Sequence, residues 1–258
     1  MSAKLSPLTG LICSMAMAFG LSACSWNSTP TTPDTVEDMS PKNLYNLAQD
    51  KINEGEYMRA SELLLALNTR YPYGQYANQS LLDLIYCYYK DEQNTKAIQI
   101  ADRFIVNNPT HKDLDYVYYM RGLVLMQQDT YLLHSLFMMD RSDRDPSYAE
   151  EAFRDFNFIV ERMGKSKYAA DAKLRMLFLK NRLARYHLSI AQYYFNRRAY
   201  IASANRAKRI LDSFHDTEFA EKALEIMIES YQNLNLPDME AEAKELMALN
   251  FPDNRLAH

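Results

Sequence analysis

The cysteine at position 24 is the residue of this sequence whose setting most clearly predicts a covalent reaction. It ends the tetrad Leu-Ser-Ala-Cys, which closes an apolar run in the first two dozen residues, and Lys4 precedes that run. A charged start, an apolar middle and small residues before a cleavage site are the layout of a secretory signal. The apolar run is shorter than the about 20 residues that span a bilayer, so we interpret residues 1–23 as a removable signal peptide.

The tetrad resembles the lipobox of bacterial lipoproteins at every position. In that class the thiol receives a diacylglyceryl group, the chain is cut before the cysteine, and the new amine is acylated, so the mature chain would begin at Cys24. Each buried methylene contributes about 0.8 kcal/mol, which makes three acyl chains a durable anchor. Ser25 stands where inner-membrane lipoproteins often have Asp, so the resemblance implies the outer membrane, facing the periplasm. The alternative is an ordinary cleavage site followed by a chance cysteine.

The composition is that of a folded soluble protein, with 48% hydrophobic and 24% charged residues. The net charge of −4 gives no reason to expect binding to nucleic acid. Residues 24–40 are rich in Ser, Thr, Pro and acidic side chains, and we expect them to be a flexible tether. Ser40 followed by Pro41 is typical of a helix start. Cys87 lies in an apolar run, which favours a buried helical residue over a reactive thiol.

Helix-breaking sites recur through residues 41–258 and predict helical repeats. They are Tyr71-Pro72, Asn108-Pro109, Met163-Gly164, Phe214-His215 and Phe251-Pro252, spaced 37, 55, 51 and 37 residues apart. The shorter spacings are close to the tetratricopeptide period of about 34 residues, and the longer ones imply added turns. Counted within such a repeat, Leu84, Tyr88 and Ala97 match its large-large-small pattern. We therefore expect an all-α, right-handed superhelical solenoid of about five tetratricopeptide-like helix hairpins, over about 41–72, 74–109, 111–164, 166–215 and 217–252.

Further features refine this repeat pattern. Tight turns are expected at Gly55 and at Asn235, an insertion near 129–147, and long helices through 173–198. Residue pairs that begin with an aromatic side chain are expected to open four of the helices: Tyr76-Ala77, Tyr116-Val117, Tyr168-Ala169 and Phe219-Ala220.

No motif in the sequence predicts catalysis, a metal site or a cofactor. The five histidines are scattered without helical pairing, and no Gly-rich phosphate loop or nucleophile motif occurs. Two clusters remain as candidate sites. The first, a candidate substrate groove, is Arg70, Tyr71, Tyr73 and Tyr76, for which inter-repeat packing is the alternative. The second, a candidate structural loop, is Arg141, Asp143, Arg144 and Asp145, for which the alternative is a solvated charged loop.

Several blocks of the sequence together resemble the BamD family, the tetratricopeptide lipoproteins of the bacterial β-barrel assembly machinery. The two most specific are Asp115–Leu123 and Asp140–Pro146, because generic repeats do not require them. The other blocks are Arg70–Tyr76, Leu82–Lys90, Asp102–Ile105, Asn108–His111, Phe178–Ala184 and Ala191–Tyr194.

This resemblance implies a non-enzymatic scaffold that helps assemble and insert β-barrel proteins into the outer membrane. Its C-terminal repeats would bind the barrel-bearing subunit, with Arg206 and the adjacent Asn205 aligning with a family contact. It would also hold accessory lipoproteins and receive unfolded outer-membrane proteins in its N-terminal repeats. The alternative function is a tetratricopeptide adaptor lipoprotein for other envelope or peptidoglycan proteins.

Overall fold

The computed structural model describes residues 38–134 and 145–257, except for the side chains of residues 130–134. The described residues form ten α-helices, and no β-strand occurs among them. The helices are α1 (Pro41–Asn53), α2 (Tyr57–Arg70), α3 (Ala77–Lys90), α4 (Asn94–Asn107), α5 (Leu114–His134), α6 (Ser147–Arg162), α7 (Ala169–Asn196), α8 (Tyr200–Phe214), α9 (Ala220–Leu234) and α10 (Pro237–Asn250). The predicted signal peptide, Cys24 and most of the predicted tether lie outside the described residues.

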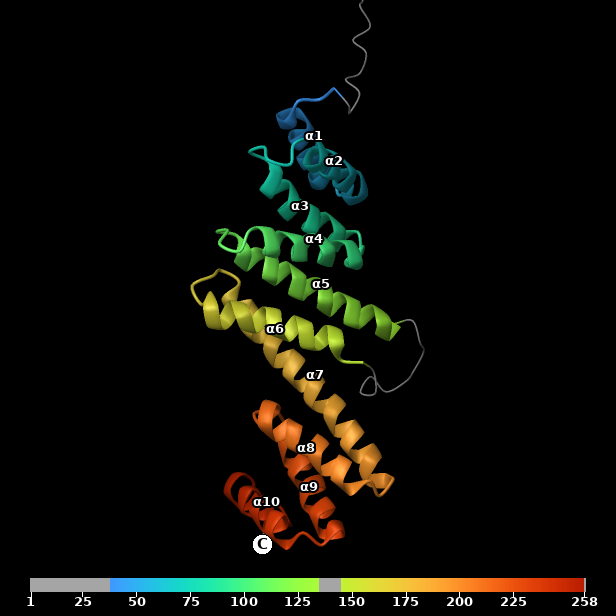
Figure 1. The fold of residues 1–258 in the computed structure, drawn as a ribbon, viewed down its shortest axis with the longest axis vertical. Helices are drawn as coiled ribbons and strands as arrows, with labels where there is room; N and C mark the ends of the chain where they lie inside the picture. The colour runs from blue at the N-terminus through green and yellow to red at the C-terminus, as the bar shows by residue number, and fades with distance from the viewer. Residues whose placement is uncertain (1–37, 135–144, 258) are drawn as a thin grey trace, which may run out of the picture. The chain divides into compact units, whose positions relative to one another are not determined.

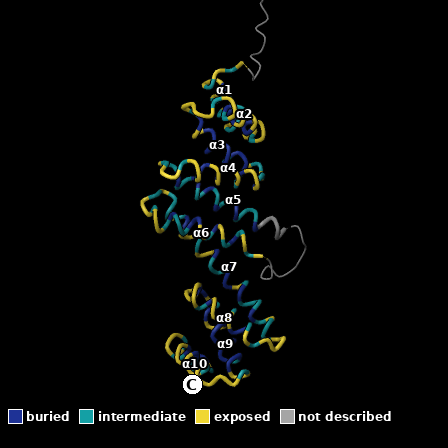
Figure 2. The backbone as a smooth tube through the Cα atoms, in the orientation of Figure 1, coloured by how far each residue is buried: buried dark blue, intermediate teal, exposed yellow. Residues whose placement is uncertain are grey.

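Each helix packs against the next one along the chain, which gives five successive hairpins from α1–α2 to α9–α10 (Figure 1). First helices of neighbouring hairpins also touch, since α3 contacts α5 and α7 contacts α9. Buried residues recur along every hairpin (Figure 2), and small ones such as Ala60, Ala97 and Ala152 are 0% exposed. Small side chains let two helices approach closely. The predicted all-α solenoid of about five helix hairpins is thus confirmed.

The N-terminal end of the solenoid begins as the sequence predicts. The Ser40 side chain accepts a hydrogen bond from the backbone N–H of Asn43, and Pro41 is the first helical residue. Cys87 on α3 is fully buried, and burial raises the pKa of its thiol to about 12. Among the described residues, no helix is both long and apolar enough to cross a membrane.

Four hairpins turn through one shared backbone conformation between their two helices. The left-handed residue of these turns is Gly55, Glu92, Arg198 or Asn235, with φ of 79°, 59°, 59° and 53° respectively. Its N–H donates to the carbonyl three residues earlier, and the next N–H donates to the carbonyl five residues before itself. This is the Schellman arrangement, in which glycine avoids the steric cost of a Cβ atom. The sequence predicted the turns at Gly55 and Asn235 but missed those at Glu92 and Arg198.

The five loops that follow α2, α4, α6, α8 and α10 also share one conformation. The N–H of Gly74, His111, Ser166, Thr217 or Asn254 donates to the carbonyl three residues earlier, and the same bond recurs three residues further on. These two turns place the first helix of each next hairpin at an equivalent position relative to the hairpin before it. One prediction is corrected here: α5 begins at Leu114, so Tyr116 lies inside the helix and does not open it. The position equivalent to Tyr76 and Tyr168 is occupied by Asp113.

The third hairpin departs most from the others. Its first helix, α5, has 21 residues and continues to His134, so the start of the predicted insertion is helical, whereas residues 135–144 lie outside the description. Gly122 allows α5 and α6 to approach closely, because a Cβ atom there would lie 2.6 Å from Cζ of the buried Phe156. In the fourth hairpin α7 has 28 residues, which agrees with the long helical run expected there.

Candidate functional site

A pocket of about 320 Å³ lies where the starts of three first helices meet. The residues that line it come from α3, from the α4–α5 loop with the first turn of α5, and from the loop before α7. They are Gln79, Leu82, Asp83, Lys112, Asp113, Asp115, Tyr116, Lys167 and Tyr168, and we refer to them as the groove site.

The repeated loop conformation explains why these helix starts converge. Because α3, α5 and α7 begin after equivalent double turns, their N-terminal ends recur at the same side of successive hairpins. Unpaired N–H groups and the helix macrodipole make a helix N-terminus favourable for negative charge. Lys112 and Lys167 add two exposed cations to the pocket. The groove site therefore combines these cations and helix ends with three carboxylates, those of Asp83, Asp113 and Asp115.

A half-buried carboxylate, that of Asp83, forms the part of the groove site nearest to the first hairpin. It accepts hydrogen bonds from the Tyr45 hydroxyl at 2.9 Å, from Gln49 Nε2 at 2.7 Å and from Gln79 Nε2 at 3.0 Å. Burial raises the pKa of Asp83, and these three donors oppose that rise. The bonds link α1 to α3 and hold the pocket wall in one geometry.

Two tyrosines, Tyr116 and Tyr168, line another part of the groove site, and Tyr168 stacks on Tyr119 of α5. The rings of Tyr119 and Tyr168 stack with centroids 4.6 Å apart, and Tyr116 lies 6.0 Å from Tyr168. The Tyr119 hydroxyl donates to Asp171 Oδ2 at 2.7 Å, which connects α5 to α7. Lys167 lies over the Tyr168 ring, with Nζ 5.0 Å from the centroid. Aromatic faces beside cations offer contacts for apolar or aromatic side chains of a bound segment.

The structure separates the four residues of the candidate substrate groove in the α2–α3 loop. Tyr76 stacks on Tyr45 at 4.8 Å, so it adjoins the groove site through the tyrosine that binds Asp83. Tyr71 is half-buried and its carbonyl accepts a hydrogen bond from Gly74, whereas Tyr73 is 99% exposed. Arg70 is exposed at the end of α2. None of the four lines the groove site itself.

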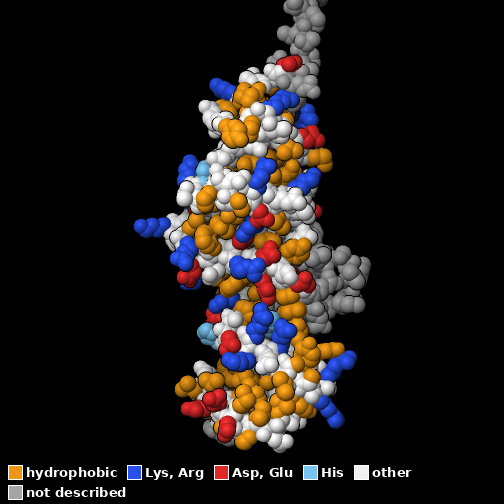
Figure 3. Space-filling model, in the orientation of Figure 1, with side chains coloured by type: hydrophobic (Ala, Val, Ile, Leu, Met, Phe, Trp, Pro, Cys, Tyr) orange, Lys and Arg blue, Asp and Glu red, His pale blue; other side chains and the backbone are white. Residues whose placement is uncertain are grey.

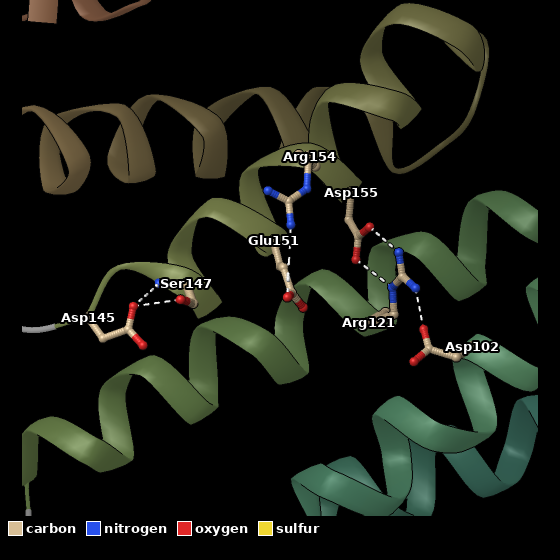
Figure 4. A network of polar contacts seen from close by, with 7 residues as sticks. All are labelled: Asp102, Arg121, Asp145, Ser147, Glu151, Arg154 and Asp155. Carbon is tan, nitrogen blue, oxygen red and sulfur yellow. Dashed lines mark hydrogen bonds and ion pairs between the residues drawn. The ribbon is translucent and has the colours of Figure 1, made fainter. Parts of the chain in front are cut away.

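An ion network around the buried Asp155 joins helices of the second and third hairpins (Figure 4). Arg121 on α5 donates to both carboxylate oxygens of Asp155 on α6, with Nε–Oδ2 at 2.8 Å and Nη2–Oδ1 at 2.5 Å. Its third nitrogen, Nη1, donates to Asp102 on α4. Asp155 is 3% exposed; burial raises its pKa, and the hydrogen bonds and charge of Arg121 lower it. One guanidinium thereby joins the second hairpin to both helices of the third.

The candidate partner residues Asn205 and Arg206 lie on α8, beside a small pocket lined with Tyr194 and Arg209. Asn205 is exposed and Arg206 is half-buried. Arg206 Nη1 lies 3.3 Å from Nδ1 of His187, a residue of α7 that is 2% exposed. Burial, together with the charges of Arg209 and Arg206, lowers the pKa of His187 to about 4. A neutral imidazole therefore accepts from Arg206 and holds its guanidinium in place.

Comparisons with known proteins agree with these features. A family described as outer membrane lipoprotein, YfiO, matches residues 37–246. The chain therefore belongs to this family of outer membrane lipoproteins. A relative from Vibrio cholerae, named outer membrane protein assembly factor BamD, is 44% identical over 96% of this chain and 99% of its own length. Relatives of the same name from Neisseria gonorrhoeae and Pasteurella multocida are 40% and 37% identical, over 94% and 90% of this chain and 91% and 87% of their own lengths. The resemblance inferred from the sequence is confirmed.

Of the candidate structural loop in this BamD-family chain, Arg141, Asp143 and Arg144 lie outside the described residues. Asp145 is exposed and accepts hydrogen bonds from the backbone N–H of Ser147 at 3.0 Å and from its hydroxyl at 2.5 Å (Figure 4). These bonds lower the pKa of Asp145 and place a carboxylate at the start of α6.

The groove site also contains residues that sequence reasoning did not select as a site. Lys112, Asp113 and Lys167 carried no sequence signal beyond their place in inter-hairpin loops. Tyr168 did carry one, because it shares with Tyr76 the position before a first helix. In the part of the chain that the structure describes, no group of three or more His, Cys, Asp or Glu side chains is arranged to hold a metal ion.

Proposed function

We propose that this chain is an outer-membrane protein assembly factor that is held in the outer membrane by lipids on Cys24 and faces the periplasm. Membership of a family described as outer membrane lipoprotein supports this, as do relatives named assembly factors. The order of signal peptide, lipobox and polar tether in the sequence also supports lipidation of Cys24.

The groove site is proposed to receive an extended segment of an unfolded outer-membrane protein. The observation that carries this proposal is the convergence of three helix N-termini, two lysines and two tyrosines, Tyr116 and Tyr168, on one pocket. An unfolded barrel strand offers alternating apolar side chains, and one that ends the chain adds a carboxylate. Aromatic contacts would accept the side chains, and the lysines with the helix ends would pair with the carboxylate. Tyr76, through its stacking on Tyr45, would support the same pocket.

The surface around Arg206 and Asn205 is proposed to bind the barrel-bearing subunit, and the C-terminal repeats to hold accessory lipoproteins. The support for Arg206 is its half-buried, oriented guanidinium, one nitrogen of which is held by the buried His187. A fixed guanidinium binds a partner carboxylate with less loss of side-chain entropy than a free one. The loop of Arg141, Asp143, Arg144 and Asp145 is proposed to fix the junction of the middle repeats.

Complementation tests the proposed function. A Vibrio cholerae strain depleted of its own BamD would express this chain, and the amount of folded β-barrel protein in its outer membrane would be measured. We expect the chain to restore that amount, and the variant Cys24→Ala to lose both palmitate labelling and most of the rescue. Normal expression of the chain without any restoration of barrel protein would contradict the proposal.

A further inference from the structure

The last hairpin carries an unusual charge. Between Asp216 and His258 there are ten Asp and Glu residues and three Lys and Arg residues, a balance of −7 within a chain whose net charge is −4. The remainder of the chain is accordingly positive by three charges. An excess of one sign on one hairpin creates a local field that attracts partners of the opposite sign.

The three cations of this hairpin are already occupied by its own carboxylates. Lys222 pairs with Glu225 at 2.5 Å, Lys244 with Glu240 at 2.9 Å, and Arg255 with Glu229 at 3.0 Å. Other carboxylates of α10, those of Asp238, Glu242 and Glu245, have no ion-pair partner within the described part of the chain. The negative excess therefore stays uncompensated at the surface of α10.

A groove with a mainly apolar lining lies along the C-terminal part of the same helix, and Leu246 in its lining follows Glu242 by about one helical turn. The groove has a volume of about 350 Å³ and runs between α8 and α10 above the start of α9. Its apolar lining is Leu211, Ala220, Leu224, Leu246 and Phe251, and we refer to it as the C-terminal groove. Figure 3 shows hydrophobic side chains gathered at this end of the molecule, with Asp and Glu at the edge. An apolar pocket with a charged rim is the usual form of a binding site for a large side chain.

The repeat register aligns an apolar residue of α10 with charged residues of α4 and α8, whereas α2 and α6 carry Ala66 and Phe158 at that position. The shared loop bonds align Leu246 with Arg209 on α8 and Arg103 on α4. Leu246 is 45% exposed, and Leu249, one turn further on, is 77% exposed. A solenoid normally ends in a repeat with a polar outer face. The outer face of α10 thus has the character of a surface that another polypeptide covers.

We propose that the C-terminal groove binds a basic segment of another protein, which inserts a large aliphatic or aromatic side chain between α8 and α10 and places flanking Lys or Arg residues against the carboxylates of α10. The apolar lining selects the inserted side chain, and the unpaired carboxylates select the flanking charges. A second copy of this chain is disfavoured as the occupant, because two hairpins with the same negative excess repel each other. This inference is independent of the function proposed for the groove site.

The test uses the full mature protein in detergent and a labelled amphipathic peptide of about 18 residues, with Leu on one face and Lys and Arg on the other. Two control peptides are a scrambled isomer of the same composition and a version with Glu in place of every cation. We expect binding of the cationic amphipathic peptide alone, and an affinity that falls as the salt concentration rises.

Variants locate the binding on the protein. Leu246→Gln combined with Leu249→Gln should weaken binding by about tenfold or more, and Glu242→Gln combined with Glu245→Gln should reduce both the affinity and its salt dependence. The matched control is Val106→Gln, because Val106 on α4 is 77% exposed and occupies the register position of Leu249. Melting temperatures and helical content check that each variant folds. If the Leu246→Gln/Leu249→Gln variant does not fold, the Glu242→Gln/Glu245→Gln variant still tests the groove.

Three results would overturn the proposal. The first is that the scrambled peptide binds as tightly as the cationic amphipathic peptide. The second is that a folded Leu246→Gln/Leu249→Gln variant binds the peptide as wild type does. The third is a concentration-dependent dimer of the wild type that this double variant does not form. The last result would place a second copy in the C-terminal groove instead of a basic partner segment.

Discussion

The groove site and the C-terminal groove are built on the same repeat, yet they offer opposite chemistry. The groove site combines lysines, carboxylates and two tyrosines around the N-terminal ends of α3, α5 and α7. The C-terminal groove has a mainly apolar lining, with Asp212, His215 and Asn250 as its polar members, and the Lys and Arg residues of its hairpin are paired with carboxylates of that hairpin. Because the two kinds of turn recur with the same hydrogen bonds, the backbone fixes where side chains stand. The side chains at those positions then decide what each surface binds.

The two regions also differ in what holds them together. The half-buried guanidinium of Arg121 joins three helices and pairs with the buried Asp155, whereas the ion pairs of the last hairpin lie at its surface. Exposed ion pairs contribute little to stability, while removal of one partner from a buried pair is costly. This contrast gives the prediction with the largest effect.

Arg121→Ala should lower the free energy of unfolding by about 3–5 kcal/mol, because Asp155 is left as a buried carboxylate without a partner. Chemical denaturation would measure the loss, with Arg154→Ala as control. Arg154 lies on the same helix as Asp155 and makes only an exposed contact with Glu151 at 3.9 Å. Equal losses for the two variants would mean that the network does not stabilise the third hairpin.

A second prediction concerns His187, which lies under the proposed partner surface. Its pKa is lowered to about 4 in the fold, so the unfolded chain, with a histidine pKa near 6.5, binds more protons over this range. Stability therefore rises with pH through this window, and lowering the pH from 7.5 to 5 should cost about 2 kcal/mol through His187.

Unfolding free energies of wild type and His187→Gln at the two pH values isolate this contribution. The variant should lose about that much of the pH dependence, while the control His215→Gln, at an exposed position, should retain it. An identical pH dependence in wild type and His187→Gln would show that the imidazole is not held neutral.

Arg206→Glu should weaken binding to the barrel-bearing subunit by about 2 kcal/mol, since charge reversal removes an attraction and adds a repulsion. Calorimetric titration with that subunit's periplasmic domains would measure it. The same variant should leave binding of the basic peptide to the C-terminal groove intact. Unchanged affinity for the barrel-bearing subunit at low salt, with wild-type helical content, would remove Arg206 from the interface.

Lys112→Glu combined with Lys167→Glu should weaken binding of a peptide from the C-terminal end of a β-barrel protein by about tenfold, because each exposed cation contributes up to about 1 kcal/mol. Fluorescence anisotropy would follow binding of that peptide and of its C-terminal amide. Lys165→Glu, an exposed lysine in the same loop outside the pocket, is the matched control. If the free acid and the amide bind the wild type equally, the lysines do not recognise a carboxylate.

The smallest expected effect concerns the shared hairpin turn. Arg198→Gly and Glu92→Gly should each raise the free energy of unfolding by up to about 1 kcal/mol, because glycine removes the left-handed strain of a residue with a Cβ atom. Gly55→Val should have the opposite sign. Thermal or chemical unfolding measures all three, and a loss of stability in both glycine variants would show that those turns do not carry the φ angles found here.

The repeat pattern was accessible from the sequence because its physical causes are local. Helix breakers such as Pro72 and Pro109 mark the ends of helices. Small residues such as Ala97 mark the points where two helices cross closely. The left-handed turns at Glu92 and Arg198 were not accessible, since neither residue favours that conformation and the surrounding repeat imposes it.

The sites were harder to predict than the fold for a related reason. Lys112 and Lys167 are far apart in the sequence and come together only because successive hairpins stack. Arg121 was part of a block that resembled the family, but its partners Asp102 and Asp155 lie on two other helices. The candidate groove at Tyr71 and Tyr73 was chosen from neighbours in the chain, whereas the pocket is made by neighbours in space.

Site-specific photo-cross-linking in living cells tests the central claim most directly. A photoreactive residue would replace Gln79 in the groove site or Leu246 in the C-terminal groove, and mass spectrometry would identify the attached segments. We predict that Gln79 captures segments of unfolded outer-membrane β-barrel proteins, and that Leu246 captures a different, basic segment. Capture of the same segments at both positions, or of no β-barrel segment at Gln79, would contradict the account.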